Sequence, residues 1–106
     1  MRLFFNLSMD KDKEREIAEF YERLKVELDM NNTWPALYLF KFIVPTSEEN
    51  IERVEIAFDC MGAVIKTTKS RTGKFTSISI DVQMQDAQEI VDKYIELSVI
   101  EGIVSL

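Results

Sequence analysis

The side chains best suited to chemistry are cationic and lie around one predicted turn. Lys69, Arg71 and Lys74 fall within or beside residues 70–73, where serine, threonine and glycine are typical of a turn. A basic turn can bind an acidic protein or an anion, although most runs of surface charge serve only solvation. Phe75 follows directly and adds an apolar ring. The pattern therefore predicts an interaction surface at this turn.

Two further groups of residues could orient a charged ligand or partner. Lys41 and Asp81 are predicted on neighbouring strands and on one sheet face, where opposite charges can pair across strands. A structural role is usual for such a pair. Pro45, Thr46 and Ser47 precede a predicted helix, whose free N–H groups attract anions. Two acidic residues follow and would repel a carboxylate, so helix capping competes with ligand binding at this loop.

The residue types that most enzymes require are missing. The chain contains no histidine and one cysteine, Cys60. Histidine is the commonest general base and metal ligand, and one thiol makes neither an internal disulfide nor a thiolate cage. Cys60 is predicted to pack near the end of a helix, with no basic neighbour to activate it. We predict no enzyme activity, no catalytic, cofactor or metal site, and a reducing cytoplasm as the location.

Length and charge exclude further classes of function. A chain of 106 residues has the size of one domain. Its net charge of −6 gives no long-range attraction to nucleic acids or anionic membranes, and no stretch approaches the ~20 apolar residues that span a bilayer. Residues 73–78 are similar to an RNA-binding motif, but Phe75 alone supplies an aromatic ring for base stacking. The predicted partner is another protein or a second copy of the chain, with a small molecule as a further option.

The elements that position these residues follow from the spacing of apolar side chains. Residues 36–44 are nearly all apolar, which predicts a central strand covered on most of both faces. Alternate side chains of a strand face opposite sides, so Phe40 and its neighbours at a spacing of two are predicted core. Thr46, with Glu49 three residues later, predicts a capped helix that ends at Gly62.

The second half of the chain contains the same kinds of signal. Strands are predicted over residues 63–69 and 74–84, on either side of the turn. The later strand alternates apolar and polar residues, as expected for a sheet with one face on a core. Asp86, with Glu89 three residues later, predicts a second capped helix, whose apolar stripe runs from Ala87 to Leu97. A short last strand is predicted over residues 103 to 106.

This order of elements over residues 34–106 predicts an α+β fold, the ferredoxin-like βαββαβ sandwich. Right-handed crossovers place both helices on one side of a four-stranded antiparallel sheet with strand order 4-1-3-2. Residues 11–33 are predicted to form an amphipathic helix, over 11–30, and a linker. We predict that this helix covers the other sheet face or binds a second subunit. Residues 1–10 are predicted to be a flexible leader.

Four short motifs in this region are shared with a known family. They are Trp34-Pro35, the strand from Tyr38 to Pro45, Ser70-x-x-Gly73-Lys74-Phe75-x-Ser77-Ile78, and the ending Tyr94…Gly102-x-Val104. On these motifs the chain resembles the YbeD-like family of small uncharacterised bacterial proteins. The resemblance implies a ferredoxin-like fold similar to regulatory ACT domains, and it implies no established activity.

Taken together, the sequence predicts a cytoplasmic, non-enzymatic module for regulation or protein interaction. We expect it to act through the sheet face away from the helices, the exposed edge strands and the basic turn, because unpaired edges and open faces accept other chains. The alternative is a sensor similar to ACT domains, which binds a small metabolite at a subunit interface beside the Pro45, Thr46 and Ser47 loop.

Overall fold

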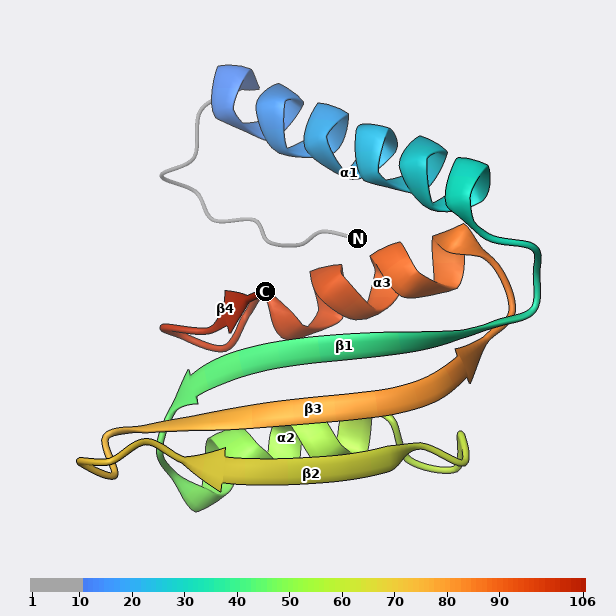
Figure 1. The fold of residues 1–106 in the computed structure, drawn as a ribbon. Helices are drawn as coiled ribbons and strands as arrows, with labels where there is room; N and C mark the ends of the chain where they lie inside the picture. The colour runs from blue at the N-terminus through green and yellow to red at the C-terminus, as the bar shows by residue number, and fades with distance from the viewer. Residues whose placement is uncertain (1–10) are drawn as a thin grey trace.

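The computed structural model describes residues 11–106, and the leader predicted over residues 1–10 lies outside the described residues. Helices and strands follow one another in the predicted order (Figure 1). Their bounds are α1 (Lys11–Asn31), β1 (Ala36–Pro45), α2 (Glu48–Ala57), β2 (Val64–Lys69), β3 (Phe75–Met84), α3 (Ala87–Leu97) and β4 (Val104–Ser105). The strands and α1 agree with their predicted bounds to within one residue at each end, and α3 begins directly after its predicted cap, Asp86.

The four strands form one antiparallel sheet in the order β2-β3-β1-β4. This is the predicted order 4-1-3-2 read from the other edge. The central strands β1 and β3 pair along their whole length, with Ala36 opposite Met84 and Pro45 opposite Phe75. The sheet and the helices together make an α+β fold consistent with the ferredoxin-like prediction.

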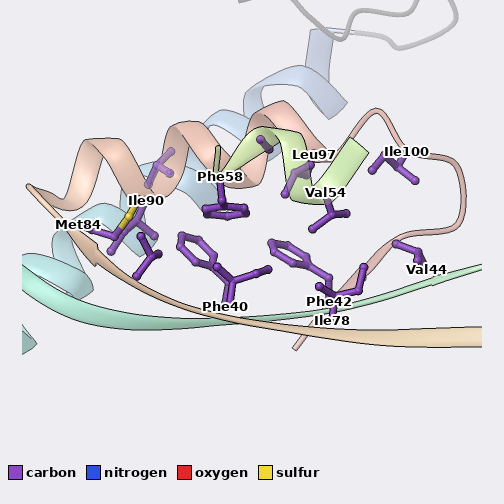
Figure 2. Packing of buried hydrophobic residues seen from close by; sticks show 14 of the residues in the cluster. Phe40, Phe42, Val44, Val54, Phe58, Ile78, Met84, Ile90, Leu97 and Ile100 are labelled. Atoms are coloured by element: carbon purple, nitrogen blue, oxygen red, sulfur yellow. The ribbon is translucent and has the colours of Figure 1, made fainter. Parts of the chain in front are cut away.

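The hydrophobic core lies between the sheet and helices α2 and α3. Phe40 and Phe42 of β1 and Ile78 of β3 point toward the helices, where they meet Phe58 and Ile90 (Figure 2). The rings of Phe40 and Phe58 lie 4.9 Å apart, and Phe40 is 0% exposed. Burying a side chain of this size stabilises a fold by roughly 1.5–3 kcal/mol. The helix-facing side of the sheet therefore supplies much of the stability.

Helix α2 begins one residue later than predicted. Its N-cap is Ser47, whose Oγ accepts a hydrogen bond of 2.9 Å from the N–H of Asn50. The predicted cap at Thr46 is therefore wrong. The Thr46 hydroxyl lies 2.8 Å from the hydroxyl of Thr76, and the Thr46 N–H donates to the carbonyl of Lys74 at 2.9 Å. Because the side-chain hydroxyl and the backbone N–H of Thr46 are both bonded to the segment at the start of β3, Ser47 caps the helix instead.

Helix α2 also ends earlier than predicted, at Ala57, with Phe58 as C-cap, instead of continuing to Gly62. The backbone leaves helical geometry at Phe58, which has a φ of −111° and a ψ of 17°, and the positive φ of 61° at Cys60 keeps the helix from resuming. A left-handed residue cannot continue a right-handed helix. The prediction that Cys60 packs beside the core is wrong for the same reason, because the chain has left the helix and the thiol is exposed.

Helix α3 confirms its predicted cap at Asp86, but the return bond of Glu89 goes to Gln85, one residue before the cap. The side chain of Asp86 accepts a hydrogen bond of 2.8 Å from the N–H of Glu89, and Glu89 Oε1 accepts one of 2.7 Å from the N–H of Gln85. Further along α3, Lys93 Nζ donates to the carbonyl of Ala57 at the C-terminal end of α2. A cation is favourable at that end of a helix. The two helices that cover the sheet are thus joined to each other.

Helix α1 lies alongside α3, on the helical side of the molecule (Figure 1). Leu28 is buried, and Tyr21 and Leu24 pack against the core. Of the two placements predicted for this helix, covering the other sheet face is wrong. Its apolar stripe instead extends the helical layer, and the Nε1–H of Trp34 donates to Asp29 at 2.9 Å just beyond the stripe.

Candidate interaction surface

The sheet face away from the helices carries no helix of residues 11–106, and we call it the open face. Strand side chains alternate between faces, so the register assigns to it the odd-numbered residues of β1 from Leu37 to Ile43, the odd-numbered residues of β3 and the even-numbered residues of β2. Val104 of β4 lies opposite Ile43 and joins them. The open face comprises Leu37, Leu39, Lys41, Ile43, Val64, Lys66, Thr68, Phe75, Ser77, Ser79, Asp81, Gln83 and Val104.

Apolar side chains on the open face are in contact with solvent. Leu37 is 73% exposed, Val64 57%, and Leu39 and Phe75 48% each. Leu39 and Val64 lie on the two sides of Asp81, which is opposite both of them in the register. Scattered exposed apolar residues are ordinary, but several on one sheet face are typical of an interaction site.

Two lysines form a basic row across the open face. Lys41 of β1 and Lys66 of β2 both lie opposite Ser79 of β3. Since neighbouring strands are about 4.8 Å apart, the two lysines start roughly 10 Å apart on the same side. The predicted pair of Lys41 with Asp81 is wrong, because Asp81 lies opposite Leu39 and no ion pair joins the two within residues 11–106.

The turn between β2 and β3 has the predicted geometry. The N–H of Ser70 donates to the carbonyl of Phe75 at 2.8 Å, and Gly73 has the expected positive φ of 79°. The predicted cationic side chains are all exposed: Lys69, Arg71 and Lys74. The register places Lys69 opposite Thr76, on the helix-facing side of β2. The turn and the lysine row therefore do not form one continuous cationic face.

Charge is divided between the sheet and the helices. The four strands and the β2–β3 turn carry five cationic side chains and a single carboxylate, Asp81. Segments 46–63 and 85–103, which contain α2 and α3, carry ten carboxylates and only two cationic side chains, Arg53 and Lys93. The acidic net charge of the chain thus coexists with a basic sheet.

The predicted ligand loop is held by bonds within the chain. Besides the Thr46 and Ser47 hydrogen bonds described above, the carbonyl of Pro45 accepts a hydrogen bond of 2.9 Å from Asn50 Nδ2. Gly102 lies close behind, since a Cβ there would be 2.8 Å from Pro45 Cγ. A metabolite site at this loop stays a prediction, and these contacts give it no support.

A hollow of about 440 Å³ lies between α1, α3 and β4, and we call it the tyrosine groove. Tyr38 and Tyr94 line it, with their hydroxyl oxygens 2.9 Å apart. Burial, and then the hydrogen bond to Tyr38, raises the pKa of Tyr94, so this hydroxyl stays protonated. Burial also raises the pKa of Tyr21, another lining residue. These two tyrosine hydroxyls therefore stay neutral within the groove.

Part of this surface was not predicted. The spacing of two between Val64 and Lys66 indicates that they share one face of β2. Which face that is depends on the register with β3. The approach of Tyr38 to Tyr94 left no local signal, because 56 residues separate them. Residues far apart in the chain meet only through the packing of α3 on β1.

Residues 11–106 contain neither a metal-binding cluster nor a helix that could cross a membrane. These residues contain no group of three or more histidine, cysteine, aspartate or glutamate side chains placed to hold a metal ion. None of their helices combines the length and apolar character that a membrane crossing needs. The predicted lack of a cofactor and the predicted cytoplasmic location stay predictions.

Comparison with known proteins identifies a family. Residues 29–106 match the family model described as "Protein of unknown function (DUF493)". Searches of curated proteins and of solved structures return no match. The match confirms the expectation of a small uncharacterised family and includes the linker before β1. The more specific resemblance to the YbeD-like family stays a prediction.

Proposed function

This chain belongs to the family of unknown function DUF493, and we propose that it is a non-enzymatic binding module that recognises an acidic protein surface through its open face. The supporting observation is that exposed apolar side chains and a lysine row share the open face, which no helix of residues 11–106 covers. Leu39 lies two residues from Lys41 along β1, and Val64 lies two residues from Lys66 along β2, so each apolar residue adjoins a lysine on the same face. The module acts by docking and positioning its partner.

The apolar and cationic parts of the open face have different roles in this proposal. Covering exposed apolar surface supplies roughly 25 cal/mol per Å² and drives association. The lysines select the partner and speed its approach, because complementary charge mainly sets specificity and association rate. An acidic, partly apolar protein surface fits both parts.

A second copy of the chain fits this face less well. Two open faces brought together would place the lysine row of one near that of the other, and like charges across an interface oppose binding. The helical surface of a second copy is acidic and could attract the lysines. Such a head-to-tail contact leaves a free open face on one copy and free helices on the other, so repeated pairing would extend into filaments. The charge pattern therefore favours a different protein.

Charge reversal on the open face tests the proposal. The tagged full-length chain and its Lys41→Glu/Lys66→Glu variant are used to capture proteins from the native cell, and captured proteins are quantified by mass spectrometry. We expect recovery of the partner to fall by at least about tenfold in the variant. The matched control is Arg23→Glu/Arg53→Glu, which makes the same charge change at exposed positions on the helices and should retain the partner.

Other outcomes contradict the proposal. Equal loss of the partner in both variants would show a general effect of net charge. Capture that nuclease abolishes would point to nucleic acid, and a dimer in light scattering that only Lys41→Glu/Lys66→Glu dissociates would point to a second copy. A third variant, Lys69→Glu/Arg71→Glu/Lys74→Glu, tests the predicted turn separately. If it alone loses the partner, the turn replaces the open face as the binding site.

A further inference from the structure

Strand β2 forms one edge of the sheet (Figure 1). It pairs with β3 from Val64 opposite Asp81 to Lys69 opposite Thr76, without a bulge, and within residues 11–106 no strand pairs with its other side. Natural proteins protect an edge from pairing by shortening it, bending it or covering it. The opposite edge strand, β4, has only two residues. Strand β2 is neither short nor bulged, and five of its six residues are exposed.

The hydrogen bonds of the hairpin show which backbone groups of β2 point away from the sheet. The N–H of Ser70, directly after β2, donates to the carbonyl of Phe75 at 2.8 Å, so the backbone of Ser70 points to β3. Backbone groups of successive strand residues point alternately to the two sides. The N–H and C=O groups that point away from β3 are therefore those of Ile65, Thr67 and Lys69. We call them the outward groups, and they can bond to a further strand.

The side chains of β2 give this edge a positive charge. Lys66 lies on the open face, Lys69 lies on the helix-facing side, and β2 contains no carboxylate. On the open face, Lys66 continues the row that begins at Lys41. A strand added to β2 lies about 4.8 Å away, so the residue opposite Lys66 becomes the next member of that row. A carboxylate at this position pairs with Lys66, and opposite charges stabilise such a cross-strand pair.

The surroundings of Lys66 specify more of the added segment. Val64 is two residues away on the same face and 57% exposed, so an apolar residue opposite it would bury apolar surface. The helical layer on the other side of the sheet contains α2, which carries four glutamates among its ten residues. These glutamates repel acidic side chains, which therefore favour the open face. The edge thus fits an extended segment with an acidic and an apolar residue two positions apart.

A second copy of the chain fits this edge poorly. Pairing of two β2 strands would bring Lys66 and Lys69 of both copies together, and neither strand supplies a carboxylate. Like charges at an interface oppose binding. The charge of the edge therefore favours an acidic segment of a different protein.

We infer that the partner adds an extended segment to the outer edge of β2, with an acidic residue opposite Lys66 and an apolar residue opposite Val64. The backbone of this segment exchanges hydrogen bonds with the outward groups, so the sheet gains a strand. The inference rests on the proposed function and deepens it, because it specifies the conformation and the chemistry of the part of the partner that meets Lys66.

Peptide selection and hydrogen exchange test the inference. Random peptides of about ten residues, displayed on phage, are selected on the full-length chain and counter-selected on its Lys66→Glu variant. The tightest binder is synthesised as the probe, and amide exchange is measured by NMR with and without it. Exchange of the outward N–H groups should slow by about tenfold or more. Exchange at Lys66 and Thr68 should change by less than about twofold, because their N–H groups already point to β3.

Two variants at one position separate backbone pairing from side-chain contact. Thr67→Pro removes an outward N–H, and proline is tolerated on an edge strand where that group faces solvent. Thr67→Ala keeps the N–H and removes the side chain. We expect Thr67→Pro to weaken binding of the probe peptide by at least about tenfold, and Thr67→Ala by less than about threefold. If circular dichroism shows that Thr67→Pro is unfolded, the exchange pattern of the unmodified chain decides alone.

Several results would overturn the inference. They are a selection that yields no peptide dependent on Lys66, a bound peptide that leaves the outward N–H groups unprotected or protects Lys66 and Thr68 equally, and full binding by a folded Thr67→Pro variant. Slow exchange of the outward groups in a dimer of the free chain would assign the edge to a second copy.

Failure of this inference differs from failure of the proposed function. A peptide that depends on Lys66 but gives no alternating protection removes only the added strand, and the open face remains the binding site. Retention of the captured partner by Lys41→Glu/Lys66→Glu contradicts the proposed function itself, whatever the exchange pattern is.

Discussion

The two faces of the sheet differ in what their side chains do, although they alternate along the same strands. Phe40 of β1 is fully buried against the helices, whereas Leu39 beside it is half exposed on the open face. The helix-facing side is apolar and closely packed, and the open face combines apolar residues with the Lys41 and Lys66 row. The comparison teaches that stability and the proposed binding are carried by alternate residues, so each can be changed separately.

The largest expected effect is on the free energy of unfolding, which should fall when a residue of the helix-facing side is truncated and hardly change when a residue of the open face is. Phe40→Ala should lower the free energy of unfolding by about 3–5 kcal/mol, because it leaves a cavity among packed rings. Leu39→Ala, one residue away, should change it by no more than about 0.5 kcal/mol. Urea unfolding followed by circular dichroism measures both. A loss of several kcal/mol in Leu39→Ala would show that something covers the open face in the free protein.

A smaller effect compares two hydroxyl residues of β3. Thr76 is buried and its hydroxyl bonds to that of Thr46, whereas Ser77 lies on the open face. Thr76→Val keeps the shape and removes the bond, so it should cost about 1 kcal/mol. Ser77→Ala should stay within about 0.5 kcal/mol of the unmodified chain. Equal costs in the same urea measurement would mean that the inner hydroxyl pair contributes nothing specific.

The smallest effect appears only in alkaline solution. The raised pKa of Tyr94 means that folding favours its protonated hydroxyl. This contribution is complete below the pKa of an unfolded tyrosine, about 10, and is lost as the pH rises above it. The unmodified chain should therefore lose more stability between pH 9 and 11 than Tyr94→Phe does. Parallel pH profiles of urea unfolding would exclude the inferred burial of this hydroxyl.

Much of the fold was predictable because its signals are local. The alternation of β1 and β3 predicted which residues face the core, and the Asp86 and Glu89 box predicted the start of α3. The strand order followed from the order of elements and the handedness of their connections. The lack of histidine likewise needed no structure. Each of these features depends on neighbouring residues or on the totals of the chain.

The candidate surfaces were decided by contacts between distant parts of the chain. A shift of two residues between β1 and β3 keeps every side chain on its face, so alternation could not tell whether Lys41 lies opposite Asp81 or Ser79. The apolar stripe of α1 fits either layer, and only packing against α3 assigns it. The tyrosine groove exists because α1, α3 and β4 meet around Tyr38. Local patterns determine the elements and their buried sides, whereas register and docking depend on the free energy of the assembled fold.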